Sequence, residues 1–178
     1  LLLDLGARRP EALSILESGY DIVQTDRVVR EHVSVENDAI TIRGQRFDTR
    51  GIRDIYLLGF GKGSCAAVYA LHNILSARLK RTIVIDRTLL ATCPDEVEAF
   101  AGTHPLPSNA NVVATKAVAG VAEAAGEGDL VLVVVAGGGS SLLCSTDEEC
   151  DASIRLFKEF ERVGANIREL NTVRKHIS

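Results

Sequence analysis

The sequence predicts an α/β fold in which a doubly wound, mostly parallel sheet lies between two layers of helices, a three-layer αβα arrangement of the Rossmann-like kind. Three short apolar runs, at residues 55–58, 82–85 and 130–135, lack the polar–apolar alternation of a sheet with one wet face. Segments of helical length separate these runs. Strands of this type, joined by helices, are parallel, covered on both faces and connected in a right-handed sense.

Residues 1–52 precede this pattern as a helical and hairpin segment, and residues 53–178 form the α/β core. Apolar residues at nearly helical spacing predict one helix, or two short ones, within 9–35. These residues are Leu13, Leu16, Tyr20, Val23 and Val28. The stretch 33–42 then alternates apolar and polar residues around Asn37-Asp38, which is typical of a short hairpin.

The core elements follow in order along the chain. After the strand at 55–58 we predict a helix at 65–78, the second strand at 82–85, a strand at 97–101 and a helix at 110–125. The apolar strand at 130–135 follows, then a helix from about Ser140 and helices at 151–163 and 167–176. Asp86 ends the second strand, and Ser108 or Asn109 can cap the helix at 110–125. We expect 130–135 to be the most buried strand, because it is the longest apolar run.

The composition argues against several classes of protein. A net charge of −4 with scattered Lys and Arg does not suit a nucleic-acid-binding surface. No apolar run approaches the roughly 20 residues of a membrane helix, and no segment resembles a signal peptide. We therefore expect a cytoplasmic protein with neither a nucleic-acid nor a membrane partner. Cys65, Cys93, Cys144 and Cys150 form no C-x-x-C pair, so we expect reduced, small apolar residues rather than metal ligands or a disulfide framework.

Two glycine-rich loops, at 59–64 and 137–141, follow predicted strands. Ligands of doubly wound sheets bind at the carboxyl ends of the strands, and N–H groups at helix starts attract anions. A strand-to-helix turn can also need glycine for its geometry alone. Two such loops in one sheet, one with Lys62 and the other with Ser140 and Ser141, favour a site for phosphate or carboxylate. Lys62 would face the positive end of a helix, which costs energy unless an anion is near; the alternative is a solvated loop lysine.

The first loop also permits a dinucleotide-binding interpretation, with Asp86 as the acid that binds a ribose. The fingerprint G-x-G-x-x-G is incomplete, because Ser64 stands where its last glycine should be and Lys62 lies where the pyrophosphate would approach. The loop lacks the four-residue spacing of a P-loop, and the second loop lacks the G-x-S-x-G turn of serine hydrolases.

Two further groups are candidates for binding. His104 lies on a stiff loop between Thr103 and Pro105, as a ligand-binding or a structural histidine. Asn171, Arg174 and Lys175 have the spacing of one helix face, although a solvated basic helix end would have the same spacing. No general base and no metal ligand is identifiable in the sequence.

Four motifs, in order, resemble the glycerate 2-kinase family. Gly59-x-Gly61-Lys62 before an Ala-rich helix is similar to its glycine-lysine turn, and Ala101 to Pro107 is similar to its A-G-x-H-P-x-P loop. Ala136 to Leu143 resembles its S-G-G-G-S-A-L-L element, and Gly164 to Ser178 its S-G-A-x-I-x-E-x-N-x-V-R-K-H-x-S signature. This sequence departs from the pattern at four positions, namely Ser64, Cys65, Ala136 and Ser141.

The resemblance implies an ATP-dependent, Mg²⁺-assisted kinase that phosphorylates the 2-hydroxyl of D-glycerate in a cleft between two domains. Lys62 would be the catalytic lysine, and Arg174 or Lys175 would offset the charge of the substrate carboxylate. The other residues carried over as substrate- or nucleotide-binding are Gly61, Gly63, His104, Gly137, Gly138, Gly139, Ser140, Ser141 and Asn171.

The family pattern also continues beyond residue 178, with a K-G-G stretch, an acidic loop, a second cationic group and a second domain. We therefore expect this chain to be a partial N-terminal domain, whose partner is the C-terminal half of its own protein, and to be inactive alone. Two alternatives stay open: an NAD(P)-dependent hydroxypyruvate reductase, and a non-catalytic module that binds sugar phosphates.

Overall fold

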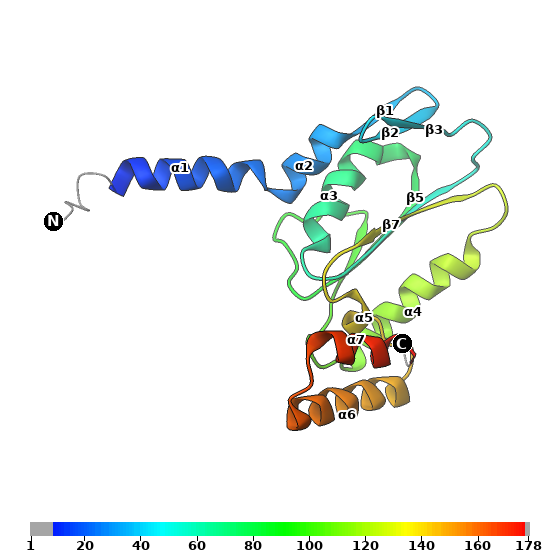
Figure 1. Ribbon diagram of the computed structural model, residues 1–178. Helices are drawn as coiled ribbons and strands as arrows, with labels where there is room; N and C mark the ends of the chain where they lie inside the picture. The colour runs from blue at the N-terminus through cyan, green and yellow to red at the C-terminus, as the bar shows by residue number, and fades with distance from the viewer. Residues whose placement is uncertain (1–8, 177–178) are drawn as a thin grey trace.

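The structure, a computed structural model, describes residues 9–176. Its centre is a four-stranded parallel sheet in the order β6-β5-β4-β7 (Figure 1). The strands are β4 (Ile55–Phe60), β5 (Leu79–Asp86), β6 (Val97–Ala101) and β7 (Leu130–Val135). The predicted α/β fold and its four core strands are confirmed.

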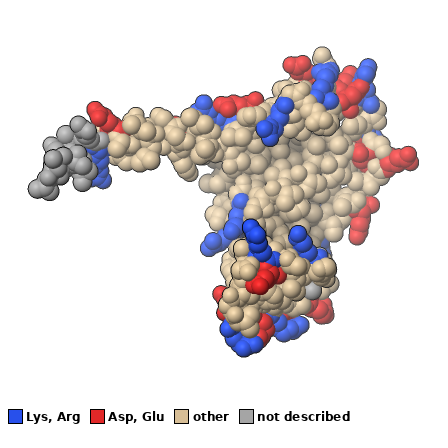
Figure 2. Space-filling view, viewed as in Figure 1, with Lys and Arg blue, Asp and Glu red and all other residues tan. Residues whose placement is uncertain are grey.

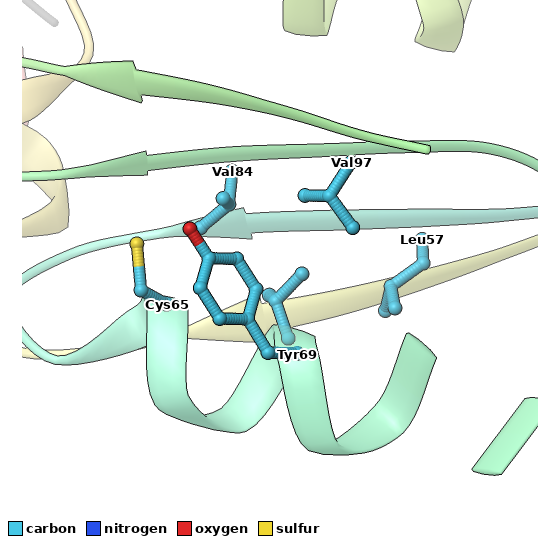
Figure 3. Close-up of a cluster of buried hydrophobic side chains, with 6 residues drawn as sticks. Leu57, Cys65, Tyr69, Val84 and Val97 are labelled. Carbon is cyan, nitrogen blue, oxygen red and sulfur yellow. The ribbon is translucent and has the colours of Figure 1, made fainter. Parts of the chain in front are cut away.

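Helices α3 (Ser64–Leu75) and α4 (Asn109–Ala124) cover opposite faces of this sheet. Leu57 of β4 packs with residues of α3, whereas the next residue, Leu58, packs with residues of α4. Figure 3 shows the α3 side of the core, where side chains of the helix lie against side chains of the strands. The residues labelled there are Leu57, Cys65, Tyr69, Val84 and Val97. Burial on both faces explains the strands without polar alternation.

Strand β7 is less buried than predicted. Within the described residues it is an edge strand, paired with β4 alone. Because α4 lies over β5 and β6, Val133 and Val135 are 50% and 68% exposed, whereas Leu132 and Val134 pack against the core under α3. The prediction that 130–135 is the most buried strand is therefore wrong. An apolar run shows which residues can be buried, and the position of the strand in the sheet decides how many of them are.

The order of the strands creates the position of the site. From β4 the chain adds β5 and β6 on one side and then returns to add β7 on the other side of β4. This reversal places the loops after β4 and β7 next to each other, at the carboxyl edge where doubly wound sheets bind ligands. The helices that follow are α5 (Gly139–Leu142), α6 (Asp147–Val163) and α7 (Ile167–Arg174), and they lie together beyond this edge (Figure 1).

Capping residues explain where these helices begin. Ser108 caps α4, as one of the two predicted alternatives. Helix α6 begins before the predicted start at 151, because the Thr146 hydroxyl accepts the Glu149 N–H at 3.1 Å. The Asn166 side chain accepts the Glu169 N–H at 3.2 Å, and the Glu169 carboxylate accepts the Asn166 N–H at 2.8 Å, which is a capping box.

The N-terminal segment contains two helices and a small antiparallel sheet. Its elements are α1 (Arg9–Ile22), α2 (Thr25–His32), β1 (Val33–Glu36), β2 (Ala39–Ile42) and β3 (Gln45–Asp48). The hairpin is confirmed, and the third strand was not predicted. Helix α1 has no buried residue and projects from the rest of the molecule (Figure 1). Among the described helices, none has the length and apolar character needed to cross a membrane.

The prediction of four reduced cysteines is wrong for two of them. Cys144 and Cys150 form a disulfide, with Cα atoms 5.8 Å apart. The turn between α5 and α6 brings them together, which their spacing alone did not reveal. Cys65 and Cys93 are free. Cys65 is buried as expected, and this burial raises the pKa of its thiol to about 11.

Candidate anion-binding site

The two glycine-rich loops lie against each other. Gly61 has a φ of 119°, and a Cβ atom at this position would overlap the backbone of Ala136. Only glycine therefore allows the loops to approach this closely. The Lys62 N–H donates to the Gly137 carbonyl at 2.8 Å, which joins the turn after β4 to the turn after β7.

The Lys62 side chain passes over Gly138. A Cβ atom at position 138 would lie 3.3 Å from Lys62 Cε and 2.7 Å from His104 Nε2, and Gly138 has a φ of 80°. Glycine is thus required at position 138 both for its backbone conformation and for space. Within residues 9–176, Lys62 takes part in no ion pair.

The second loop offers fewer free N–H groups than an anion cradle would have. The Gly139 N–H donates to the Ala136 carbonyl at 3.3 Å, and the Ser141 N–H donates to the Gly138 carbonyl at 3.0 Å. These two amides therefore hold the turn itself. The side chains of Ser140 and Ser141 line the cavity beside this loop.

Asn111, in the first turn of α4 and fully buried, fixes the loop that carries His104. Its carbonyl oxygen accepts the N–H groups of Thr103 and Ser108, both at 3.0 Å. Its amide donates to the carbonyls of Thr103 at 3.1 Å and Leu142 at 3.0 Å. One side chain thus ties together the His104 loop, the start of α4 and the end of α5.

The C-terminal helix contributes a buried cation. Arg174 is 6% exposed, and its Nη1 donates to the Ser141 hydroxyl at 2.6 Å. Burial lowers the pKa of Arg174, and a guanidinium keeps its charge at neutral pH. Ser141 is a position where this sequence departs from the family pattern, so the departure supplies an acceptor for the arginine.

These side chains line one cavity of about 510 Å³, next to the junction of the two loops. No Asp or Glu is among the described residues that line it. The lining residues are Lys62, His104, Pro105, Gly138, Ser140, Ser141, Phe157, Ile167, Leu170, Asn171, Arg174 and Lys175. A cavity with three cationic side chains and no carboxylate in its lining suits an anionic ligand. Figure 2 shows Lys and Arg side chains gathered where the C-terminal helices meet the rest of the molecule.

His104 is the titratable group of this cavity closest to neutral pH. Burial lowers its pKa, and the positive charges of Lys62, Arg174 and Arg87 lower it further. The ring is therefore neutral at pH 7 and has one nitrogen that donates and one that accepts.

All seven predicted site residues other than glycine line this cavity, whereas four of the predicted glycines do not. Gly61, Gly137 and Gly139 form the backbone of the two turns. Gly63 lines a second hollow on the other side of Lys62, together with Asp86 and Arg87 among others.

Asp86 does not have the geometry of a ribose-binding acid. It is 3% exposed and its two oxygens already accept backbone N–H groups. Oδ1 accepts those of Gly63 at 3.1 Å and Arg87 at 2.6 Å, and Oδ2 accepts that of Cys65 at 2.9 Å. The structure therefore does not support the dinucleotide-binding interpretation, which depended on Asp86 as the acid that binds a ribose.

Sequence reasoning missed Asn111 and four lining residues: Pro105, Phe157, Ile167 and Leu170. A signal for Asn111 was present, because it stands three residues after a serine that can cap a helix. Periodicity gave no signal for the apolar lining residues, since their spacing is the same as that of ordinary core residues, although Pro105, Ile167 and Leu170 lie within the family motifs.

Sequence comparison shows the family to which this chain belongs. The sequence profile of the family described as "Domain of unknown function (DUF4147)" matches residues 11–178. The chain belongs to the DUF4147 family. This DUF4147 chain is 28% identical over 154 residues to the glycerate 2-kinase of Pyrococcus horikoshii and 26% identical over 170 residues to the D-glycerate 2-kinase of Thermotoga maritima.

The crystal structure of a glycerate kinase from Thermotoga maritima has the same fold as this DUF4147 chain, with a TM-score of 0.71 and 26% identity. The match covers 93% of this chain and 37% of that one. The two sequence relatives match over 85% and 94% of this chain, which spans 34% and 37% of their length. The resemblance to glycerate kinases is confirmed, and the chain corresponds to about a third of each relative.

We expect sulfate to bind this DUF4147 chain more tightly as the pH falls from about 8 to about 6. Protonation of His104 adds a positive charge to the cavity, and a bound dianion opposes the lowering of the His104 pKa by Lys62 and Arg174. Isothermal titration at several pH values measures this, and His104→Asn should remove the dependence. The control His32→Asn changes an exposed histidine on α2 and should keep it. A parent-like pH dependence in His104→Asn would contradict the placement of the anion beside His104.

Proposed function

We propose that the full-length protein containing this domain is a cytoplasmic, ATP-dependent kinase that phosphorylates the 2-hydroxyl of D-glycerate. The observation that carries the proposal is the cavity lined by Lys62, Arg174 and Lys175 and by no acidic residue among those described. Both reactants are anions, one a carboxylate and the other a chain of phosphates. The names of the two sequence relatives support this choice of substrate.

Lys62 is the proposed catalytic residue. Phosphoryl transfer needs reactants held in place and charge neutralised on the transferring group, rather than covalent chemistry by the protein. Lys62 extends from a turn that is fixed to both neighbouring strands and takes part in no ion pair among the described residues. Its ammonium group is therefore available to a γ-phosphoryl group or to the oxygen that attacks it.

Arg174 or Lys175 is proposed to bind the carboxylate of glycerate. Arg174 is held by Ser141 at the wall of the cavity, so its charge is oriented before the substrate arrives. Asn171 and Ser140 add hydrogen-bonding groups to the lining of the cavity, and neutral His104 can donate or accept beside Gly138. These groups would orient the 2-hydroxyl toward Lys62.

The cationic lining fits the phosphates of ATP, which supplies the transferred phosphoryl group. Magnesium is different: within residues 9–176 no group of three or more His, Cys, Asp or Glu side chains could hold a metal ion. Mg²⁺ is therefore proposed only as the counter-ion that accompanies ATP, as the family resemblance implies. Metal ligands and the second cation are assigned to the part of the protein outside this chain.

The test is a coupled ADP-release assay of the full-length protein with Mg-ATP and D-glycerate, followed by phosphorus NMR of the product. We expect glycerate-dependent ADP release and 2-phosphoglycerate. The 178-residue chain, assayed in the same way, should give only background because it spans about a third of its relatives. Oxidation of NAD(P)H with hydroxypyruvate in place of ADP release would support a reductase. Anion binding without turnover by the full-length protein would support a sugar-phosphate-binding module.

A further inference from the structure

We infer that Asp86 is a positioning residue that fixes the backbone on which Lys62 stands. The inference deepens the proposed function, because it concerns how the proposed catalytic lysine is oriented. Asp86 is 3% exposed, ends β5 and reaches across to the turn after β4. Its carboxylate accepts the N–H groups on either side of Ser64, namely those of Gly63 and Cys65.

Among the described residues, no other group caps these donors. Helix α3 begins after Gly63, which has a φ of 84° and no side chain, and its first turn contains no acidic residue. The first N–H groups of a helix need acceptors, and here the neighbouring strand provides them. Asp86 therefore performs, from another strand, the role that a capping Ser, Thr, Asn or Asp usually performs from the same helix.

Hydrogen bonds therefore hold the backbone on both sides of Lys62. Its own N–H donates to Gly137 at 2.8 Å, and the Gly61 N–H before it donates to the Ile85 carbonyl at 3.1 Å. After it, Gly63 is tied to Asp86 at 3.1 Å, and the Ser64 hydroxyl donates to the same Ile85 carbonyl at 3.0 Å. Without Asp86, the N–H groups of Gly63 and Cys65 at the start of α3 would lose their acceptor, and the backbone directly after Lys62 would be held only through the Ser64 hydroxyl.

The three donors explain why the residue is an aspartate. A carboxylate presents two acceptor oxygens, one for Cys65 and one for Gly63 and Arg87. An asparagine has one oxygen, so its NH₂ group would face at least one backbone N–H. The substitution Asp86→Asn thus hardly changes the volume of the side chain, yet it places an NH₂ donor against a backbone N–H donor in a buried position.

Two possible roles of Asp86 predict effects of opposite sign on anion binding. If it acted only through its negative charge, Asp86→Asn would strengthen sulfate binding, because a charge that repels anions would be gone. If it positions Lys62, the same substitution weakens sulfate binding although it removes a negative charge. The sign of the change separates the two roles.

The test is a double-mutant cycle on sulfate affinity, measured by isothermal titration for the parent chain, Lys62→Ala, Asp86→Asn and the double variant. We expect each single substitution to weaken sulfate binding by roughly tenfold, and the double variant to bind no more weakly than Lys62→Ala. Such non-additivity means that Asp86 acts through Lys62. Parent-like or tighter binding by Asp86→Asn would overturn the inference, as would losses that add in the double variant.

Asp129→Asn is the matched control. Asp129 has a side chain that is 1% exposed, accepts the Gly126 N–H at 2.8 Å and lies before β7, at the opposite edge of the sheet. This variant should bind sulfate like the parent even if it melts at a lower temperature. If Asp86→Asn does not fold, Gly63→Ala replaces it in the cycle. The Gly63→Ala variant strains the same turn only through the positive φ at position 63, since no atom lies within 4 Å of the new methyl group.

The double-mutant cycle also distinguishes a failure of the positioning role of Asp86 from a failure of the proposed anion site. Weakened binding by Lys62→Ala together with parent-like Asp86→Asn would overturn the positioning role and leave the anion site intact. Parent-like binding by Lys62→Ala would overturn both, because the lysine would then not contact the anion.

Discussion

Replacing Lys62 with alanine is expected to lower kcat of the full-length enzyme by roughly 10²- to 10³-fold, the effect of removing one preorganised group that stabilises a transition state. KM for glycerate should change much less, because the carboxylate is assigned to Arg174 or Lys175. Steady-state kinetics with Mg-ATP and D-glycerate measure both constants. Lys62→Arg should recover little activity, because a planar guanidinium cannot take the position of a compact ammonium group.

Lys80→Ala is the control for this substitution. Lys80 is an exposed lysine near the start of β5, 4.0 Å from Asp54, at the end of the sheet away from the cavity. Its removal should leave kcat within about twofold, as for a surface substitution outside a site. Nearly full kcat in Lys62→Ala would exclude Lys62 from the mechanism and leave the fold and family assignment standing.

Gly138→Ala should abolish the stabilisation of the chain by sulfate or phosphate. The new methyl group would lie 2.7 Å from His104 Nε2 and 3.3 Å from Lys62 Cε, so both side chains must move away from the positions they hold in the cavity. Ligands stabilise a folded protein only through preferential binding to it, so the anion-dependent rise in Tm reports on the site. Thermal unfolding with and without sulfate measures this rise.

Gly128→Ala separates the loss of the site from backbone strain. Gly128 has a φ of 89°, close to that of Gly138, and no atom lies within 4 Å of a Cβ atom there. Both variants should lose about 1 kcal/mol or more of stability from the positive φ. Only Gly138→Ala should lose the response to sulfate. A Gly138→Ala variant with the parent's response would mean that the loop is a turn without a binding role.

The fold was predictable from the sequence because its strands are buried on two faces. The runs that include Leu57 and Val84 do not alternate polar and apolar residues, which is typical of parallel strands covered by helices on both faces. The exposure of Val133 and Val135 was not predictable, since it depends on which part of the sheet α4 covers. The contact between Cys144 and Cys150 was also not predictable, since it depends on the path of the turn between α5 and α6.

The sequence predicted which residues make up the candidate site better than it predicted how they are arranged in space. Lys62, Arg174 and Lys175 were identified from motifs and helical spacing, and they line one cavity. The role of Asp86 was not predictable, because an acid at the end of a strand can bind a ribose or cap a neighbouring helix. Only the directions of the N–H groups of Gly63, Cys65 and Arg87 distinguish these two roles.

The central claim is that the cavity beside Lys62 holds an anion. The most direct measurement is a crystal structure of the chain with selenate, a close analogue of sulfate whose selenium can be located by anomalous scattering. We expect an anomalous peak within hydrogen-bonding distance of the Lys62 ammonium and of His104 or Arg174, and no such peak in crystals of Lys62→Ala. Selenate bound elsewhere on the parent chain, with this cavity free of anomalous density at saturating concentration, would contradict the account.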